Sequence, residues 1–353
     1  MIKKKKQKQE LWGIIVLVAL AVVAGLAIIS VGQPQRENIE SVVNAIIEEK
    51  PIVCEKIRRL DGLCFSGEKE PLVFSVMIDN HNEARPVFGL NQASLVYETI
   101  VEAPITRFLA VFYSEPKVKK IGPVRSARPF FADWALEFDG PYLHVGGSDD
   151  ALNYLKGKSV FDLNEFSSGK YFWRDYSKAA PHNIFTSTEL LFKAMVDKKW
   201  EVKNEFSSWK FRPDRTFNEN SAPVAPPQTI NIDFADAAYS VQWKYDAERG
   251  DYSREQSGAA YKDADGNEIR AKNIAVMYAE SKVIDSYGRR KTKTVGSGKA
   301  VVFSGGEAID GEWRRSSLSE RTRFFNAAGE EIAFLSGTTW IEVVPSHFPK
   351  VTY

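Results

Sequence analysis

An uncharged, strongly apolar run over residues 11–31 is the feature that most constrains this chain. As a helix it is just long enough to cross about 30 Å of hydrocarbon. Five lysines lie within the first ten residues, and by the positive-inside rule they stay in the cytoplasm. The run is long for a cleaved signal peptide and lacks a small-x-small exit, which favours an uncleaved anchor over cleavage. We therefore expect a single-pass protein of the plasma membrane, with residues 32–353 outside the cytoplasm.

The charge balance and the composition exclude several classes of protein. Lys plus Arg number 47 and Asp plus Glu number 46, so the basic surface that nucleic acid requires is missing. Apolar residues make up 44% of the chain, which is enough for a large buried core. Two cysteines and four histidines exclude a multi-cysteine zinc scaffold. We expect no metal site, no cofactor and no nucleic-acid partner.

Cys54 and Cys64 are the two cysteines, and nine residues separate them. Outside the cytoplasm a disulfide can persist. We predict that the two are joined, and the alternative is two free thiols. In the chain-entropy model a loop this short contributes about 2.5–3 kcal/mol to stability.

Changes in composition divide the chain into four parts. Residues 1–31 are the cytoplasmic tip and the anchor, and residues 32–68 are a stalk with the cysteine loop; residues 33–50 have apolar positions at helical spacing. Residues 69–221 mix strand and helix patterns, and residues 222–353 are rich in strand patterns. The proline-rich stretch 222–228 marks the boundary between the last two parts.

The patterns predict an α/β (α+β) fold with mixed sheets. In the first folded part we expect strands over residues 72–79, 94–102, 106–114 and 141–147, and helices over residues 128–138, 148–155 and from the capping box at 186–189 to about 200. In the second part we expect strands over residues 229–234, 239–245, 251–256, 273–279, 299–304, 322–326 and 339–344. Turn signals separate several of these strands, among them the glycine pair at 305–306.

Arg125 and Arg128 flank the expected start of the helix at 128–138, with Ser126 as its cap. Two guanidinium groups there would suit a carboxylate or phosphate ligand. The alternative is an internal ion-pair network, because Glu98 and Glu102 share one face of a strand and Arg107 follows its turn. We favour the network over the ligand site, since opposite charges are already at hand.

Three further groups of residues could contribute to a ligand site. Asp79, His81 and Arg85 follow the first strand, where α/β sheets place ligands. His144 precedes a glycine pair, but no phosphate-binding motif is present and the following aspartates would repel a nucleotide. Arg174 and His182 lie among aromatic residues that could line a pocket for a sugar or a peptide. No G-x-S-x-G or H-E-x-x-H motif is present, so no catalytic residue is assigned.

An ordered set of motifs resembles the YerB-like lipoprotein family. The motifs are VMIDN, ARPVFGL, LVYETIVEAPITRFLAVF, KIGPVRSARPFF, YLHVGGS and PHNIFT, followed by YDAERGDYSR, NIAVMY, GSGKAVVF, GEWRR and GTTWIEVV. The resemblance covers roughly residues 55–347. It implies a cell-envelope protein whose fold is a three-layer ββα sandwich, with no established activity. Members of that family commonly have a lipobox cysteine, whereas this chain has the apolar anchor instead.

These observations predict a ligand-binding or envelope-maintenance module, with an anionic envelope ligand or an envelope protein as its partner. One alternative is a scaffold that recruits proteins through the strand-rich part. The other is a cell-wall hydrolase that uses Asp79, Glu98, His144 or His182 as acid and base.

Overall fold

The computed structural model describes residues 54, 56–102, 104–158, 160–213, 229–234, 236–347 and 351–353. Residues Lys56–Tyr353 form one compact unit. The expected membrane segment 11–31, the stalk 33–50 and the linker 222–228 lie outside the described residues, so the boundary at 221–222 stays a prediction. Within the described ranges no helix has both the length and the apolarity that a membrane crossing requires.

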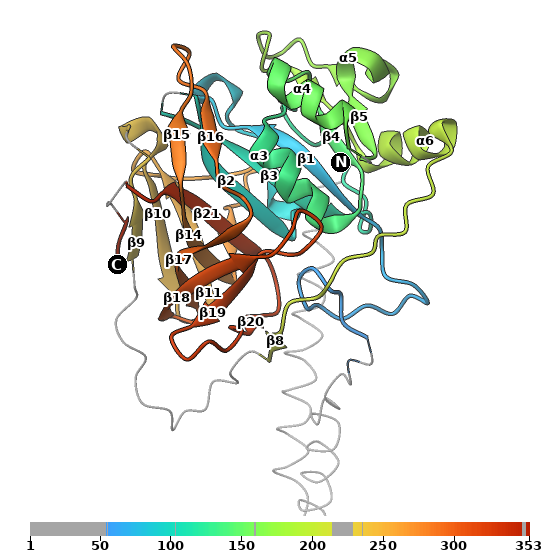
Figure 1. The fold of residues 1–353 in the computed structure, drawn as a ribbon. Coiled ribbons are helices and arrows are strands. Elements are labelled where there is room, and N and C mark those ends of the chain that lie inside the picture. The colour runs from blue at the N-terminus through green and yellow to red at the C-terminus, as the bar shows by residue number, and fades with distance from the viewer. Residues whose placement is uncertain are drawn as a thin grey trace, which may run out of the picture. The chain divides into compact units, whose positions relative to one another are not determined.

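A mixed sheet of ten strands is the largest element of the compact unit (Figure 1). In spatial order its strands are β19 (Arg323–Asn326), β18 (Glu307–Arg315), β17 (Gly296–Ser304), β14 (Asn273–Ala279), β21 (Thr339–Pro345), β2 (Leu95–Glu102), β3 (Ile105–Tyr113), β1 (Val73–Asp79), β4 (Tyr142–His144) and β5 (Asp162–Asn164). β21 pairs in parallel with β14 on one side and with β2 on the other. The sheet therefore contains strands from both halves of the chain.

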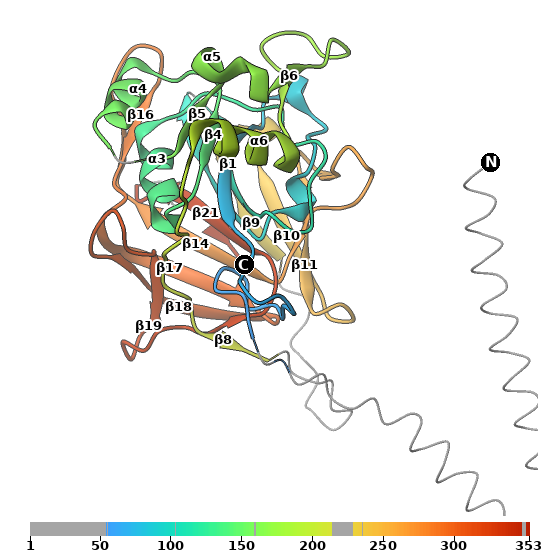
Figure 2. The same ribbon diagram turned by 90° about the vertical axis from the view of Figure 1, so that its right-hand side faces the viewer.

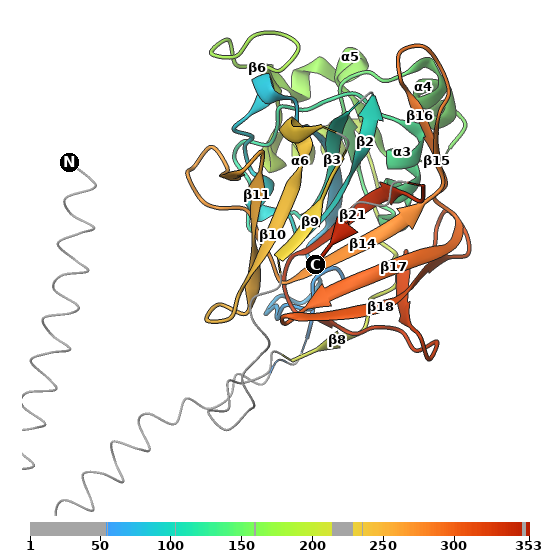
Figure 3. The same ribbon diagram turned by 90° about the vertical axis from the view of Figure 1, so that its left-hand side faces the viewer.

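A second sheet has six strands and is formed by the strand-rich half alone (Figure 3). Its strands are β12 (Ala259–Ala260), β11 (Asp251–Gln256), β10 (Val241–Asp246), β9 (Thr229–Ile232) and β22 (Val351–Thr352), with β13 (Arg270–Ala271) paired to β11. Three two-stranded pairs complete the strands: β15 (Ser281–Val283) with β16 (Arg290–Thr292), β20 (Phe334–Leu335) with β8 (Phe211–Arg212), and β6 (Trp173–Arg174) with β7 (Ile184–Phe185).

Among the described residues the helices are short, and they lie between residues 82 and 198 apart from one 3-10 turn (Figure 2). They are α3 (Pro129–Ala135), α4 (Asp149–Lys156), α5 (Glu165–Ser168) and α6 (Thr188–Lys198), with the 3-10 turns η1 (Asn82–Ala84), η2 (Leu90–Gln92), η3 (Leu136–Phe138), η4 (Gly169–Tyr171) and η5 (Ala237–Tyr239). Ser148 and Ser187 cap α4 and α6 by accepting hydrogen bonds from backbone N–H groups three residues on. The prediction that Ser126 caps α3 was wrong: the cap position is Arg128, and no side-chain bond is made there.

Two hydrophobic cores lie on opposite faces of the ten-stranded sheet. Val96, Phe108 and Trp340 belong to one core together with Trp243 and Tyr252 of the six-stranded sheet. The other core is formed by neighbouring residues of the same strands, which point the opposite way, and by side chains of α3 and α4. Because β2 is buried on both faces, apolar and polar residues do not alternate along its sequence.

The expected mixed α+β class is confirmed, and most expected strands are present within a few residues. The strand expected over 141–147 ends at His144, because the chain then turns at Gly146 with φ +56°. The sequence patterns did not predict β18 or the β15–β16 hairpin. β18 is mostly polar and half-exposed, and it forms by pairing along the whole of β17 across the expected turn at Gly305 and Gly306.

Cys54 and Cys64 are joined by a disulfide, as predicted. Cys64 also pairs with Ile57 in an isolated antiparallel bridge. The β-bridge between Ile57 and Cys64 closes a small loop at the start of the compact unit.

Candidate functional site

Asp79, the last residue of β1, lies at the centre of a buried polar cluster and is 1% exposed. Nδ1 of His182 is 2.7 Å from Oδ2 of Asp79, and Nε of Arg125 is 2.9 Å from the same oxygen. The backbone N–H of His81 donates to Oδ1 at 3.0 Å. Two groups that the sequence analysis treated separately, residues 79–85 and 171–183, therefore meet at one carboxylate.

The surroundings of Asp79 fix both its charge and the tautomer of His182. Burial raises the pKa of Asp79, but the hydrogen bond with His182 and the charges of Arg125 and Arg107 outweigh burial and lower the pKa to about 2. The carboxylate is therefore ionised at neutral pH and accepts the Nδ1 hydrogen of His182. In a neutral imidazole this leaves a lone pair on Nε2.

His81 and Glu83 complete the cluster on its solvent side. The rings of His81 and His182 are stacked with centroids 4.7 Å apart. Oε2 of Glu83 lies 3.4 Å from Nε2 of His182, and the Glu83 side chain is 70% exposed. Glu83 belongs to η1, the short turn that follows β1.

Arg107 lies behind Asp79 and is almost fully buried. It donates to the backbone oxygen of Ser126 at 2.9 Å. Burial and the like charge of Arg125 lower the pKa of Arg107 to about 10, while Asp79 opposes that shift. Arg125 thus pairs directly with the buried carboxylate of Asp79, and the charge of Arg107 stabilises its ionised form from nearby.

Arg128 does not belong to the cluster around Asp79; it forms an ion pair with Glu102. It lines a cavity of about 380 Å³ between α3, α4 and the β15–β16 hairpin, which we term the anion cavity. The other cationic lining residues are Arg289, Arg290 and Lys291, the carboxylates are Asp133 and Asp150, and Phe130 and Ile284 are apolar. Burial lowers the pKa of Arg128 to about 10.

Arg290 is the most unusual of these cations. The residue is 8% exposed, and its Nε donates to the hydroxyl of Ser281 at 3.1 Å. Burial lowers its pKa, and no neighbouring carboxylate opposes that shift. Within the described part of the chain Arg290 forms no ion pair, whereas Arg289 beside it is paired with Asp285.

The expected single network of Glu98, Glu102 and the three arginines 107, 125 and 128 is not what the structure shows. A β-bulge between Ile100 and Glu102 shifts the register of β2, so the two glutamates do not share one set of neighbours. Glu102 pairs with Arg128, whereas Glu98 pairs with Arg254 at 2.7 Å. The arginines are distributed among separate partners.

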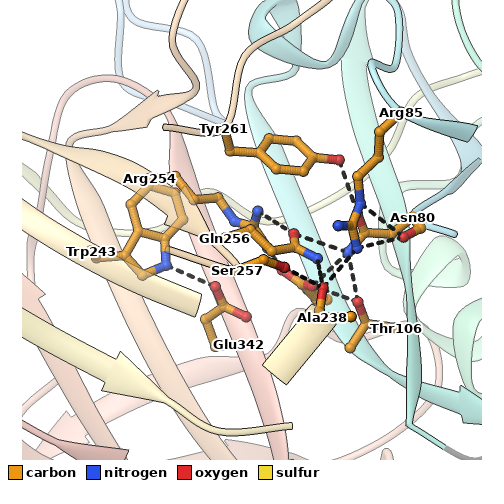
Figure 4. A network of polar contacts seen from close by, with 11 residues as sticks. Asn80, Arg85, Thr106, Ala238, Trp243, Arg254, Gln256, Ser257, Tyr261 and Glu342 are labelled. Carbon is orange, nitrogen blue, oxygen red and sulfur yellow. Dashed lines mark hydrogen bonds and ion pairs between the residues drawn. The ribbon is translucent and has the colours of Figure 1, made fainter. Parts of the chain in front are cut away.

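The Glu98–Arg254 pair belongs to a polar network between the two sheets (Figure 4). Both side chains are fully buried, and the Arg254 guanidinium lies within 6 Å of the ring centroids of four aromatic residues: Phe108, Trp243, Tyr261 and Trp340. Asn80 donates to Glu98, Thr106 and Gln256 and accepts from Tyr261. This network connects the sheets from within.

Arg85 lies at one side of this network and is hydrogen-bonded to it through Asn80. Its guanidinium donates to the backbone oxygens of Asn80 and Ala238, as Figure 4 shows. Arg85 thus joins the turn after β1 to the loop before β10.

His144 and Arg174 are held by nearby groups. His144 is fully buried, with Nδ1 2.6 Å from the oxygen of Gly146 and Nε2 2.7 Å from Asp162. Arg174 donates to Asn183 at 3.0 Å and lies 3.6 Å from Glu165. In the structure these two residues do not join the cluster around Asp79.

Several residues of these sites were missed from the sequence. Glu83 follows His81 by two residues, and that spacing was a signal that could have been used. Arg254 and Glu342 gave no signal, because each lies in an ordinary strand pattern and acquires its role from distant partners. Arg290 gave none because its strand, β16, was itself not predicted.

Comparisons with known proteins identify the family. Residues 63–201 match the N-terminal domain, and residues 230–341 the C-terminal domain, of the family described as "Protein of unknown function (DUF3048)". The chain is 31% identical over 284 residues to "Putative lipoprotein YerB" of Bacillus subtilis (strain 168), covering 79% of this chain and 82% of that protein. The crystal structure of YerB protein from Bacillus subtilis matches with a TM-score of 0.75 at 28% identity, covering 85% of this chain and 100% of that one. The resemblance seen in the motifs is confirmed, and the chain belongs to the DUF3048 family of YerB-like proteins.

Proposed function

We propose that this protein is a membrane-anchored module outside the cytoplasm that binds an anionic ligand of the cell envelope in the anion cavity. The apolar run at 11–31 supports the anchor, and the disulfide supports an oxidising compartment. The name of the Bacillus subtilis relative, a lipoprotein, places that protein at a membrane as well. For the fold we propose the three-layer ββα sandwich, which is supported by the two cores on opposite faces of one sheet.

The observation that carries the proposal is the buried Arg290 without a carboxylate partner. A buried guanidinium is costly unless a negative charge compensates it. The cavity carboxylate of Asp133 is already bonded to the hydroxyls of Tyr154 and Thr294. An anionic ligand would supply the charge that Arg290 lacks, and guanidinium forks suit carboxylates and phosphates.

The cavity also sets limits on the ligand. Its volume of about 380 Å³ is near the lower end for small-molecule sites. Phe130 and Ile284 provide an apolar wall beside the cationic groups. We therefore propose a small carboxylate or phosphate compound with an apolar portion, of the kind that peptidoglycan peptides and glycerol-phosphate polymers present.

Arg290→Met tests this proposal, because it removes the charge and keeps the side-chain stem. Loss of one buried charged partner should weaken binding at least about tenfold. The full chain in detergent micelles would be titrated with muramyl peptides and with glycerol phosphate, and the heat of binding measured. Lys282→Met is the matched control, since Lys282 is an exposed cation on the same hairpin outside the cavity. Equal affinities for the two variants, or no binding of either ligand by the unmodified chain, would reject the site.

The anchor and its orientation need a separate test. A reporter enzyme that is active only outside the cytoplasm, fused after Tyr353, should be active in cells. Replacing the five N-terminal lysines by glutamate should reduce that activity, because these charges hold the tip inside. A reporter active only in the cytosol would contradict the proposed location.

The hydrolase and scaffold alternatives stay predictions. The hydrogen bond between Asp79 and His182 favours the hydrolase, because it orients a base. However, Nε2 of His182 contacts Glu83, which is not a hydroxyl or thiol nucleophile. Release of products from peptidoglycan fragments would support the hydrolase, and a specific cross-linked partner would support the scaffold.

A further inference from the structure

The cluster beside Asp79 contains an arrangement that the anion cavity does not use. Across the described residues, His81, Glu83 and His182 each direct one ligand atom to a common point, and these atoms all lie within 4.8 Å of one another. We propose that these three side chains form a binding site for a divalent transition-metal ion, with zinc as the best match. This site is independent of the proposed anion cavity and shares no residue with it.

The spacing of the ligand atoms fits a tetrahedral ion. At the usual zinc distances of about 2.0–2.2 Å, two ligands are roughly 3.3–3.5 Å apart. Nε2 of His182 and Oε2 of Glu83 are already 3.4 Å apart, and Nδ1 of His81 is 4.0 Å from the same oxygen. This Nδ1 accepts a hydrogen bond from the backbone N–H of Glu83 at 3.3 Å, and the metal ion would replace that bond. Glu83 is exposed and His81 is one-third exposed, so small rotations bring the third ligand into range.

Asp79 provides a second, independent observation. It holds His182 through Nδ1, so the lone pair of the neutral ring is on Nε2, the atom nearest Glu83. Metal-binding histidines almost always donate their other ring hydrogen to a carboxylate or a carbonyl, which fixes the ring and increases its basicity. His182 is 5% exposed, so its ring is also held by the surrounding atoms.

The charged groups around the proposed site determine the net charge of the bound ion and its ligands. Arg125 and Arg107 compensate Asp79, so Glu83 supplies the single negative charge among the ligands. The ammonium group of Lys178 is held by the backbone oxygens of Ala84 and Arg85, at 2.9 and 3.3 Å, and so fixes the end of the turn that carries Glu83. A divalent ion here would keep a net positive charge and an open position for water or an anionic oxygen.

The donor set selects the metal. Two imidazoles and one carboxylate suit zinc and its neighbours among the transition metals, whereas calcium and magnesium prefer sites made of oxygen alone. Two histidines and one glutamate with an open fourth position is a set that zinc enzymes use. The remaining histidines are His144, which is buried and bonded at both ring nitrogens, and the exposed His347.

Titration of the metal-free, untagged full chain in detergent micelles with zinc chloride tests the proposal. We expect one zinc ion per chain by calorimetry, and cobalt substitution should give the intense visible absorption of tetrahedral coordination. Glu83→Gln should weaken zinc binding at least about tenfold, and since Glu83 is exposed this variant should fold normally. Asp79→Asn should weaken it by about 10–100-fold while leaving one zinc per chain.

Matched controls separate this site from other causes. His347→Gln removes an exposed imidazole elsewhere and should bind zinc like the unmodified chain. Arg290→Met should also leave zinc affinity unchanged, so failure of the anion cavity and failure of the metal site are distinguishable. No zinc binding up to millimolar concentration, or equal affinity of His182→Asn and His347→Gln, would overturn the proposal.

Discussion

Glu98→Gln is expected to lower the free energy of unfolding by about 3–5 kcal/mol, the range found when one partner of a buried ion pair is removed. Glu98 and Arg254 are both fully buried, and 2.7 Å separates their charged atoms. The glutamine amide would leave the guanidinium in the core without a counter-charge. Its NH2 group would also replace one carboxylate oxygen and so face either the donor of Arg254 or the donor of Asn80.

Glu342→Gln is the matched control, and we expect it not to lower the free energy of unfolding. Glu342 lies beside Glu98 in the parallel pairing of β21 with β2. Burial, and then the charge of Glu98, raise the pKa of Glu342 well above its usual value, so the folded protein favours the neutral carboxyl. Glutamine keeps the oxygen that accepts the Trp243 indole N–H at 2.8 Å, so we expect no loss of stability.

The pH dependence distinguishes the two glutamates further. Because the folded-state pKa of Glu342 is raised, the unfolded chain releases its proton first, and stability falls as pH rises above 4.5. Glu342→Gln abolishes this loss, so its stability advantage over the unmodified chain should grow as pH rises above 4.5. Denaturant unfolding at several pH values measures both effects. A Glu98→Gln variant as stable as Glu342→Gln would mean that Arg254 does not depend on Glu98.

Glu137→Gln is the second substitution with a large expected effect, again about 3–5 kcal/mol. Its carboxylate is fully buried in the other core, 3.5 Å from Arg315 and 3.6 Å from Arg321. The hydroxyls of Tyr97 and Thr322 also donate to it. Neutralising Glu137 would leave two buried guanidinium groups without their shared anion.

Thr322→Val is the matched control for this cluster. It removes one hydrogen bond to the carboxylate and keeps the volume and the charge, so a loss of about 1.5–3 kcal/mol is expected. Thermal and denaturant unfolding would rank the two variants. If Thr322→Val cost as much as Glu137→Gln, the hydrogen bonds and not the charge would hold the cluster together.

The sequence was sufficient to predict those structural features that depend on residues close together in the chain. β11 and β14 were predicted with their observed bounds, and the apolar and β-branched residues of β14 made that strand the clearer of the two. Ser148 was recognised as a cap from the two aspartates that follow it. The spacing of the two cysteines and the expected compartment predicted the disulfide.

The sites depend on contacts that no local pattern encodes. Asp79 and His182 were both named as candidates, but their hydrogen bond joins residues 103 positions apart. The two glutamates of β2 were placed on one face because the bulge between Ile100 and Glu102 leaves no mark in the composition. Arg290 was missed because burial without a carboxylate, which makes it notable, is a property of the folded chain.

The pairing of β2 with β21 has a consequence for how this chain is made. Thr99 donates a hydrogen bond to the oxygen of Val343, 244 residues further on. During synthesis the edge of β2 therefore stays open and apolar until the last strands are made. The N-terminal and C-terminal domains therefore depend on each other for folding. A chain cut between them should give fragments that aggregate when alone and form the native sheet only when mixed.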